Sequence, residues 1–240
     1  LFRSIARMNL YLNGVEDFSI ACADTLEHPA FLDGSHLRKF DIVLANPPYS
    51  IKEWNREKFM NDKWGRNFLG TPPQGRADYA FLQHIIASMN ETQGRCAILF
   101  PHGVLFRDEE YELRKKLVEI DIVDCVIGLG PNLFFNASME ACIIICKNRK
   151  EDSHKGKVIF IDAKGEVSRK NAESYLENTH IQKIISAYEN FEDIEYFAKV
   201  ADINDIDNNK SLLSIQSYVK QKGTNEIYIL DESLPKWIEA

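Results

Sequence analysis

A chain of 240 residues with 45% hydrophobic side chains is long enough to bury one large core, or one core with a small appendage. Its net charge of −7 argues against a generally basic protein that coats DNA, because such proteins bind by neutralising phosphates with Lys and Arg. The five cysteines form no Cys-x-x-Cys pair and no apolar stretch could cross a membrane, so we expect buried, reduced thiols, no metal site and a cytoplasmic location.

The first elements alternate between helix and strand. Residues 1–12 carry apolar side chains at helical spacing, and Gly14 follows as a stop signal. Short apolar runs predict strands at 18–23 and 40–45, the second of which has the composition of a strand buried on both faces of a parallel sheet. Because the chain starts with Leu inside a predicted helix, we expect it to be a fragment of a longer protein.

The middle of the chain continues this alternation. Asp78 is a predicted N-cap for a helix over 79–93 that Gly94 ends. Further elements are a strand at 95–100, an amphipathic helix at 108–120 and strands at 122–129 and 141–147. The connection 130–140 is too short for a helical crossover, so the last two strands should form an antiparallel hairpin.

The C-terminal part has a different composition. A charged turn near residue 150 precedes a predicted strand at 157–163 and a helix at 180–191. From residue 201 onward, Asp and Asn are frequent, and the apolar segments 212–220 and 226–230 are expected to wrap the body or meet a partner. We divide the chain into a main body, 1–165, and a helical or irregular extension, 166–240, that is expected to contact a partner.

One polar loop stands out after the strand at 40–45, where the sequence reads "ANPPY". Two consecutive prolines cannot donate to a sheet ladder and push their neighbours away from helical angles, so Asn46–Tyr49 should be stiff and extended. In an open α/β sheet, ligands bind outside the carboxyl ends of the strands, which is where this loop and Asp24 would lie. The sequence therefore predicts a binding site at this rim.

The groups of this loop suit an exocyclic amine on a flat ring. The Asn46 side-chain oxygen and the Pro47 carbonyl can accept its two protons, and Tyr49 can stack on the ring, as an enzyme that flips a base out of a duplex requires. The following segment, 51–76, mixes six basic groups with aromatic residues, a composition typical of a nucleic-acid surface. From charge alone, a solvated loop with aromatic anchors explains that segment as well.

Several segments together resemble the modification subunits of type I restriction systems. They include "ANPPY", "ARMNLYLNG", "ADYAFLQHII", "FPHGVLFR", "VIGLGPNLFFN" and "KVIFIDA", in this order. The resemblance implies a class I S-adenosylmethionine-dependent methyltransferase, an α/β Rossmann-like fold with a mostly parallel sheet and a terminal antiparallel hairpin, here truncated at its N-terminus. It implies transfer of a methyl group from S-adenosylmethionine to adenine N6 in DNA.

The resemblance also implies site residues. Asn46, Pro47, Pro48 and Tyr49 form the catalytic loop, Asp24, Asn46, Asp78 and Phe81 line the cofactor, and Tyr49, Phe134 and Phe135 face the target base. Most of them have a structural alternative: Asp24 as a turn residue, Asn46 and Tyr49 as parts of a purely structural Pro-Pro loop, Asp78 as a helix cap, and the Phe pair as apolar residues that close the hairpin onto the core. For His102, backbone hydrogen bonding is a better explanation than acid-base chemistry, and Cys142 and Cys146 are expected to be packing residues.

The partners implied by the resemblance are double-stranded DNA, a specificity subunit, a second modification subunit and the restriction subunit. The sequence lacks a Gly-x-Gly that opens a helix after a strand, so we expect this chain alone to bind the cofactor poorly and to be inactive. Two alternatives remain open: a non-catalytic assembly or DNA-binding module, and an amino-methyltransferase that acts on cytosine N4 or on protein glutamine.

Overall fold

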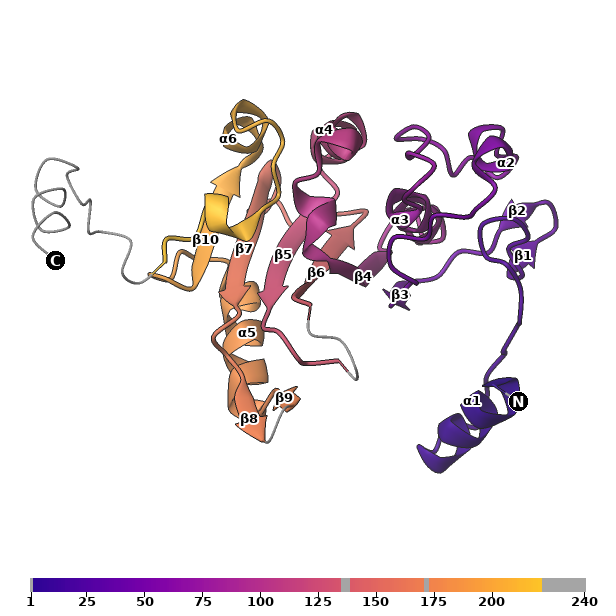
Figure 1. Ribbon diagram of the computed structural model, residues 1–240, viewed down its shortest axis with the longest axis horizontal. Coiled ribbons are helices and arrows are strands. Elements are labelled where there is room, and N and C mark those ends of the chain that lie inside the picture. Colours follow the sequence, from indigo (N-terminus) through magenta and orange to yellow (C-terminus); the bar gives the residue numbers. More distant parts are fainter. Residues whose placement is uncertain (1, 135–138, 171–172, 222–240) are drawn as a thin grey trace, which may run out of the picture.

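The computed structural model describes residues 2–134, 139–170 and 173–221, and centres them on a sheet of six strands in the order β10-β7-β5-β6-β4-β3 (Figure 1). The strands of this sheet are β3 (Ile42–Ala45), β4 (Arg95–Pro101), β5 (Val123–Leu129), β6 (Ala141–Lys147), β7 (Lys157–Ala163) and β10 (Ala198–Asp202). Two small hairpins flank it: β1 (Leu32–Asp33) with β2 (His36–Leu37), and β8 (Ser168–Lys170) with β9 (Glu173–Tyr175).

The sheet is mixed rather than mostly parallel, so that part of the predicted fold is wrong. Strands β3 and β4 are parallel, as are β5 and β7, but β6 runs antiparallel to both β4 and β5. The short connection 130–140 forces β6 to return beside β5, which confirms the predicted hairpin, and β6 then separates two strands that would otherwise be neighbours. Strand β10 adds another antiparallel pair, with β7.

Helices cover the two faces of the sheet unequally (Figure 1). One face is packed by α3 (Asp78–Ala87), α4 (Tyr111–Glu119) and α6 (Ile203–Asn208), and the other by α5 (Asn178–Asn190). Strand side chains alternate between the two faces with a period of two. In β7, Phe160 packs with the first group of helices, whereas Ile159 and Ile161 pack toward α5.

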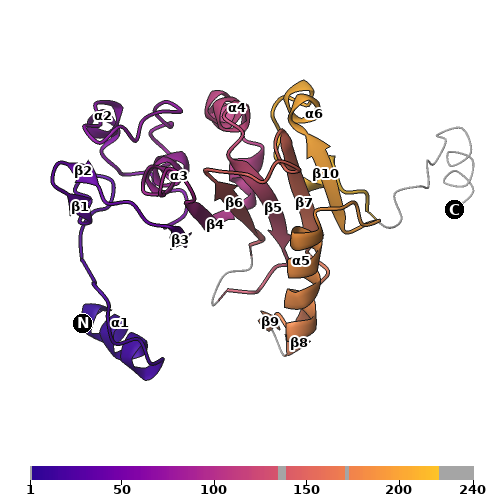
Figure 2. The ribbon, with the colours of Figure 1, turned by 180° about the vertical axis from the view of Figure 1, so that it is seen from behind.

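The N-terminal part confirms one prediction and contradicts two. Helix α1 (Phe2–Leu12) forms as expected and stands apart from the sheet (Figure 2). Residues 18–23 form no strand, because in the described part of the chain no other strand lies beside them to supply hydrogen bonds. Cys22 in this segment is therefore exposed rather than buried, while the other four cysteines are buried as predicted.

The helix predicted over 79–93 ends six residues early. The Ser88 hydroxyl donates to the carbonyl of His84, and the Asn90 amide donates to the carbonyl of Phe40 at 2.7 Å, which turns the chain toward the sheet. The predicted strands at 95–100 and 157–163 and the helix at 180–191 are confirmed. The helix predicted over 108–120 begins with a short 3-10 turn, η2 (Asp108–Glu110), and continues as α4.

The C-terminal part packs on the same sheet. Leu213, Ile215 and Val219 are buried in the core around the 3-10 turn η3 (Ile215–Ser217), which confirms that residues 212–219 wrap the body. The segment 226–230 lies outside the described residues, and the division at residue 165 stays a prediction. Within the described residues, no helix combines the length and apolar composition needed to cross a membrane. The remaining elements are α2 (Arg56–Met60) and the 3-10 turn η1 (His102–Leu105).

Candidate active site

The Asn46–Tyr49 loop leaves the C-terminal end of β3. The register of the sheet brings the ends of β3, β4, β5 and β7 to this same rim. Asn46 is exposed, Pro47 is buried and Tyr49 is half-buried. The loop is thus anchored by its first proline and presents an amide and part of an aromatic ring to the outside, which agrees with the position predicted for it.

The loop is closed by one internal hydrogen bond. The Tyr49 hydroxyl donates to Asn46 Oδ1 at 2.9 Å, across two prolines whose φ angles are fixed by their rings. Because Tyr49 supplies the proton, the bond fixes the oxygen end of the Asn46 amide rather than its nitrogen end. One lone pair of Oδ1 remains able to accept from another donor.

Tyr49 is a hydrogen-bond donor rather than a base at neutral pH. Burial raises the pKa of its hydroxyl above the usual 10.0, and the nearby Cys142 raises it further. The hydroxyl therefore keeps its proton, and the Asn46 amide does not titrate. This loop can orient and polarise a bound group, but it cannot remove a proton in the manner of a general base.

Asp78 is not the N-cap that its position suggested. It is the first residue of α3, and the cap position is Ala77, which makes no side-chain cap bond. The buried Asp78 carboxylate instead accepts from the backbone amide of Ser50 at 2.7 Å and from Arg107 Nη1 at 2.8 Å. The side chain thus turns away from its own helix and binds the end of the Asn46–Tyr49 loop.

Asp24 lies in a turn, as expected if it is a structural turn residue. Its Oδ1 accepts from the backbone amides of Leu26 and Glu27, each at 2.9 Å, and the residue is exposed. This turn is bound to the segment 51–76, because the buried Arg66 donates to the carbonyls of Thr25 and Leu26. The role of Asp24 toward a cofactor stays a prediction.

The aromatic candidates differ in their surroundings. Phe81 on α3 is partly buried against a small cluster that includes Leu26 and Phe59. Phe134 is partly buried against the core on the α5 side of the sheet, the packing that its structural alternative predicts. Phe135 lies outside the described residues. Contacts of these rings with a cofactor or a base remain predictions.

His102 makes the backbone hydrogen bond expected of it. Its Nε2 donates to the carbonyl of Ala141 at 2.9 Å, and burial lowers the pKa of the imidazole below 6.5, with Lys164 acting in the same direction. The ring is therefore neutral at physiological pH, and its hydrogen bond joins the 3-10 turn that follows β4 to the start of β6. Cys142 and Cys146 are fully buried packing residues, as predicted.

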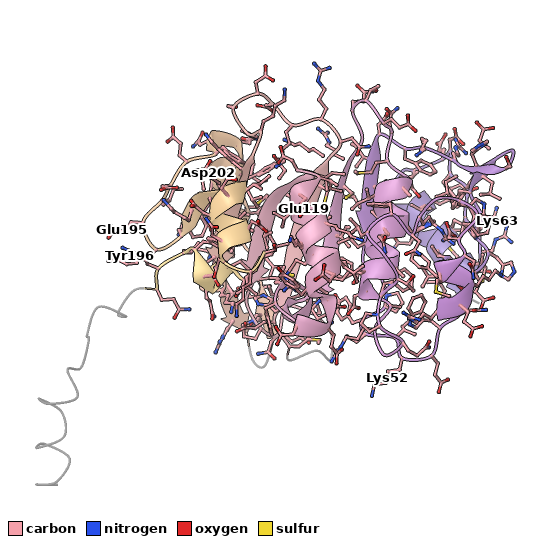
Figure 3. All side chains as sticks on the ribbon, turned by 90° about the horizontal axis from the view of Figure 1, so that it is seen from above. Lys52, Lys63, Glu119, Glu195, Tyr196 and Asp202 are labelled. Carbon is pink, nitrogen blue, oxygen red and sulfur yellow. The ribbon has the colours of Figure 1, made fainter. Side chains whose placement is uncertain are left out.

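The basic segment 51–76 contains fewer free cations than its sequence suggested. Arg66 is buried and paired with Asp62 at 2.6 Å, between the rings of Phe59 and Trp64. Lys52 and Lys63 are exposed, and they lie at the opposite end of the molecule from Glu195 and Asp202 (Figure 3). The segment therefore has the aromatic anchors of the second explanation, and its exposed lysines Lys52 and Lys63 are accompanied by the exposed acids Glu53 and Glu57.

Ser50 and Arg107 are parts of this site that sequence reasoning missed. They meet Asp78 across sequence separations of 28 and 29 residues. Arg107 ends the segment "FPHGVLFR", but no local periodicity links positions so far apart, so the sequence does not predict that Ser50 and Arg107 meet Asp78. The three-dimensional arrangement of the strand ends was needed to find them.

The comparisons with known proteins agree in pointing to one family. Residues 2–227 match the family described as N-6 DNA Methylase. The chain is 32% identical over 230 residues to the type I restriction enzyme MjaVII methylase subunit of Methanocaldococcus jannaschii, and 32% identical over 233 residues to the HindI methylase subunit of Haemophilus influenzae. These alignments cover 90% and 92% of this chain, but 38% and 50% of those relatives.

Solved structures give the same result for the fold. The type I restriction-modification methyltransferase subunit from Streptococcus thermophilus superposes with a TM-score of 0.80 at 39% identity, covering 90% of this chain and 46% of that one. The EcoKI M protein superposes with a TM-score of 0.65 at 18% identity, which supports the fold alone, and the alignment covers 99% of this chain and 55% of that one. The chain spans half or less of the length of the two curated relatives. It belongs to the N-6 DNA methylase family.

Proposed function

We propose that this chain forms the adenine-binding part of a modification subunit in a type I restriction-modification complex, which transfers a methyl group to adenine N6 in DNA. One observation carries the proposal: Asn46 is exposed at the C-terminal rim of the sheet, with its Oδ1 oriented by the Tyr49 hydroxyl. Family membership supports the reaction class, and the similarity to methylase subunits supports the complex.

The loop activates the acceptor by hydrogen bonding. Asn46 Oδ1 and the Pro47 carbonyl accept the two protons of the adenine amine, which directs the nitrogen lone pair away from the loop, and the Tyr49 ring stacks on the base. The amine is a weak nucleophile, so its orientation and polarisation supply the catalysis. Formation of the new N–C bond would break the bond between the methyl group and the sulfonium sulfur, which would leave as a neutral thioether. The surplus proton of the amine would then leave to solvent, because Tyr49 keeps its own.

S-adenosylmethionine, when bound, supplies a methyl group on a positively charged sulfur. Two of the predicted contacts fit an adenosine: the exposed carboxylate of Asp24 and the half-buried ring of Phe81, which both border the cluster around Leu26. Asp78 does not fit as a direct contact, because its buried carboxylate is bound by Ser50 and Arg107. We therefore assign Asp78 to the loop rather than to the cofactor.

The DNA and the other subunits belong to the same proposal. Exposed Lys52 and Lys63 follow the catalytic loop in sequence and suit phosphate contacts, and Lys63 lies over the Trp64 ring at 4.6 Å. A separate specificity subunit supplies sequence recognition in this proposal, which is compatible with the net charge of −7 of this chain. A second modification subunit and the restriction subunit complete the proposed assembly.

The proposal is tested by replacing Asn46 with Ala in the complete modification complex. Removal of the oriented oxygen should lower kcat for radiolabelled methyl transfer into unmethylated DNA by about 100-fold or more, since preorganised polar groups have effects of this size. The KM for DNA should change much less, because the backbone phosphate contacts remain. An unchanged kcat in the Asn46→Ala variant would remove the proposed role of the loop.

An assembly role is the second candidate. One face of β3 exposes Ile42 and Leu44, whose side chains are 54% and 77% accessible, an arrangement that favours contact with further polypeptide. An assembly module would leave methyl transfer unchanged when Asn46 is replaced. The same experiment therefore separates the two candidates.

A further inference from the structure

Two distant parts of the chain, at Ser50 and at Arg107, converge on the buried carboxylate of Asp78. Its Oδ1 accepts from the backbone amide of Ser50 at 2.7 Å, and its Oδ2 accepts from the Ser50 hydroxyl at 3.3 Å and from Arg107 Nη1 at 2.8 Å. Arg107 Nη2 also reaches the Ser50 hydroxyl at 3.4 Å. The Asp78 side chain is 0% exposed, so water does not compete for these bonds.

Arg107 is itself held in a fixed position. Gly103 provides the space for its guanidinium, because a Cβ on that glycine would lie 2.4 Å from Arg107 Nε. The backbone carbonyl of Arg107 accepts from the buried Arg114 at 2.9 Å, and Arg114 also binds the carbonyl of Ser211 at 2.8 Å. The cation that faces Asp78 is therefore fixed at both its backbone and its side chain.

Ser50 is the point at which this network acts on the loop. Its φ angle of 49° lies in the left-handed region, which a serine adopts at a cost that local contacts must offset. Its amide is one peptide unit from Tyr49, whose hydroxyl sets the Asn46 amide. If the bond to Asp78 were lost, Ser50 would relax toward ordinary angles and move the Tyr49 ring.

We propose that Asp78 and Arg107 are positioning residues for the reaction and that together they hold the Asn46–Tyr49 loop in its reactive geometry. This inference rests on the proposed methyl transfer. Neither residue is placed to touch the base, because the Asp78 side chain is 0% exposed and the Arg107 guanidinium is bound to Asp78 and Ser50. Their effect reaches the acceptor through Ser50 and then Tyr49.

Two variants perturb the network in different ways. Asp78→Asn keeps the shape but places an amide where Arg107 needs a carboxylate, and Gly103→Ala displaces the Arg107 guanidinium without changing any charge. In the complete modification complex, each should lower kcat by about 10- to 100-fold, since misplacement by about 1 Å has effects of this size. The KM values for DNA and for S-adenosylmethionine should stay within about 3-fold, because no binding contact is removed.

Asp124→Asn is the matched control. Asp124 is another 0% exposed carboxylate paired with a cation, Lys147, at 3.0 Å, but it lies near the N-terminal end of β5, away from the loop. Its replacement should lower thermal stability and leave kcat unchanged at a temperature where the protein is folded. A fall in kcat equal to that of Asp78→Asn would overturn the proposal, because loss of stability alone would then explain both.

Hydrogen exchange at the Ser50 amide separates this inference from the proposed function. The Ser50 amide should exchange at least about 10-fold faster in both Asp78→Asn and Gly103→Ala than in the parent protein. In the control Asp124→Asn it should exchange at the rate of the parent protein. Unchanged exchange or unchanged kcat in the two network variants would overturn the positioning role. If the parent complex transfers no methyl group, the proposed function fails, and the positioning role in catalysis fails with it. Faster exchange in the two network variants would then show only that the network holds Ser50.

Discussion

Glu110 is a carboxyl group in a buried environment that disfavours its ionised form. Its side chain is fully buried, its Oε2 lies 3.4 Å from Arg107 Nη1, and its Oε1 has no hydrogen-bond partner among the described residues. The pKa of this carboxyl is raised to about 7, mainly by burial; the neighbouring Asp78 acts in the same direction, while Arg107 and Arg76 lower the pKa. A single guanidinium thus faces two buried carboxylates, and near neutral pH Glu110 takes up the proton that balances them.

A stability change between pH 5 and pH 8 follows from this shift. The pKa of Glu110 is about 7 in the folded state and about 4.5 when exposed, so the folded state binds the proton more tightly. The stabilisation is complete below pH 4.5 and is lost as the pH rises through 7, a loss on the order of 2–3 kcal/mol. Glu110→Gln should remove this loss and be the more stable protein at pH 8.

Urea denaturation of both proteins at pH 5 and pH 8 measures this difference. The comparison cancels the other titrating groups, since they are common to both proteins. Parallel stability curves for the parent chain and Glu110→Gln over this range would show that Glu110 keeps an ordinary pKa.

The element that departs most from expectation is β3. Its apolar sequence predicted burial on both faces, yet it is an edge strand of the sheet, with Val43 packed under the helices and Ile42 and Leu44 exposed on the opposite face. On that face, side chains of the strands next to α5 are buried against this helix, whereas no side chain of β3 belongs to the cluster around α5. The apolar sequence of a strand shows that both of its faces could be buried. Whether a helix packs on each face depends on other parts of the chain, which the sequence of the strand does not specify.

Replacing both Ile42 and Leu44 with Thr tests this element. Both side chains are already in water, so the free energy of unfolding should change by no more than about 0.5 kcal/mol, and self-association at the strand edge should decrease. Sedimentation velocity and urea denaturation measure the two effects. Val43→Thr, which places a hydroxyl on the packed face, is the control and should cost about 1–2 kcal/mol. A larger cost for the Ile42/Leu44 pair would mean that this face is covered.

At the scale of the whole molecule, the sequence predicted the elements better than their arrangement. The Pro-Pro pair fixed the loop at Asn46–Tyr49, and the short connection 130–140 fixed the β5–β6 hairpin, because both effects are local. The bonds of Asp78 to Ser50 and Arg107 are not local, and the insertion of β6 between β4 and β5 follows from packing. For the same reason residues 18–23 have a strand composition without forming a strand, since pairing needs a neighbour.

The Asn46–Tyr49 loop is proposed to present adenine N6 for methylation, and the chemical identity of the methylated product distinguishes this role from the alternatives. Unmethylated DNA is incubated with S-adenosylmethionine carrying a labelled methyl group and the complete modification complex, and the digested nucleosides are then separated by mass spectrometry. We expect label in N6-methyladenine, and we expect Asn46→Ala to lower that signal by about 100-fold. Label in N4-methylcytosine or in a protein glutamine, or an undiminished N6-methyladenine signal from Asn46→Ala, would contradict it.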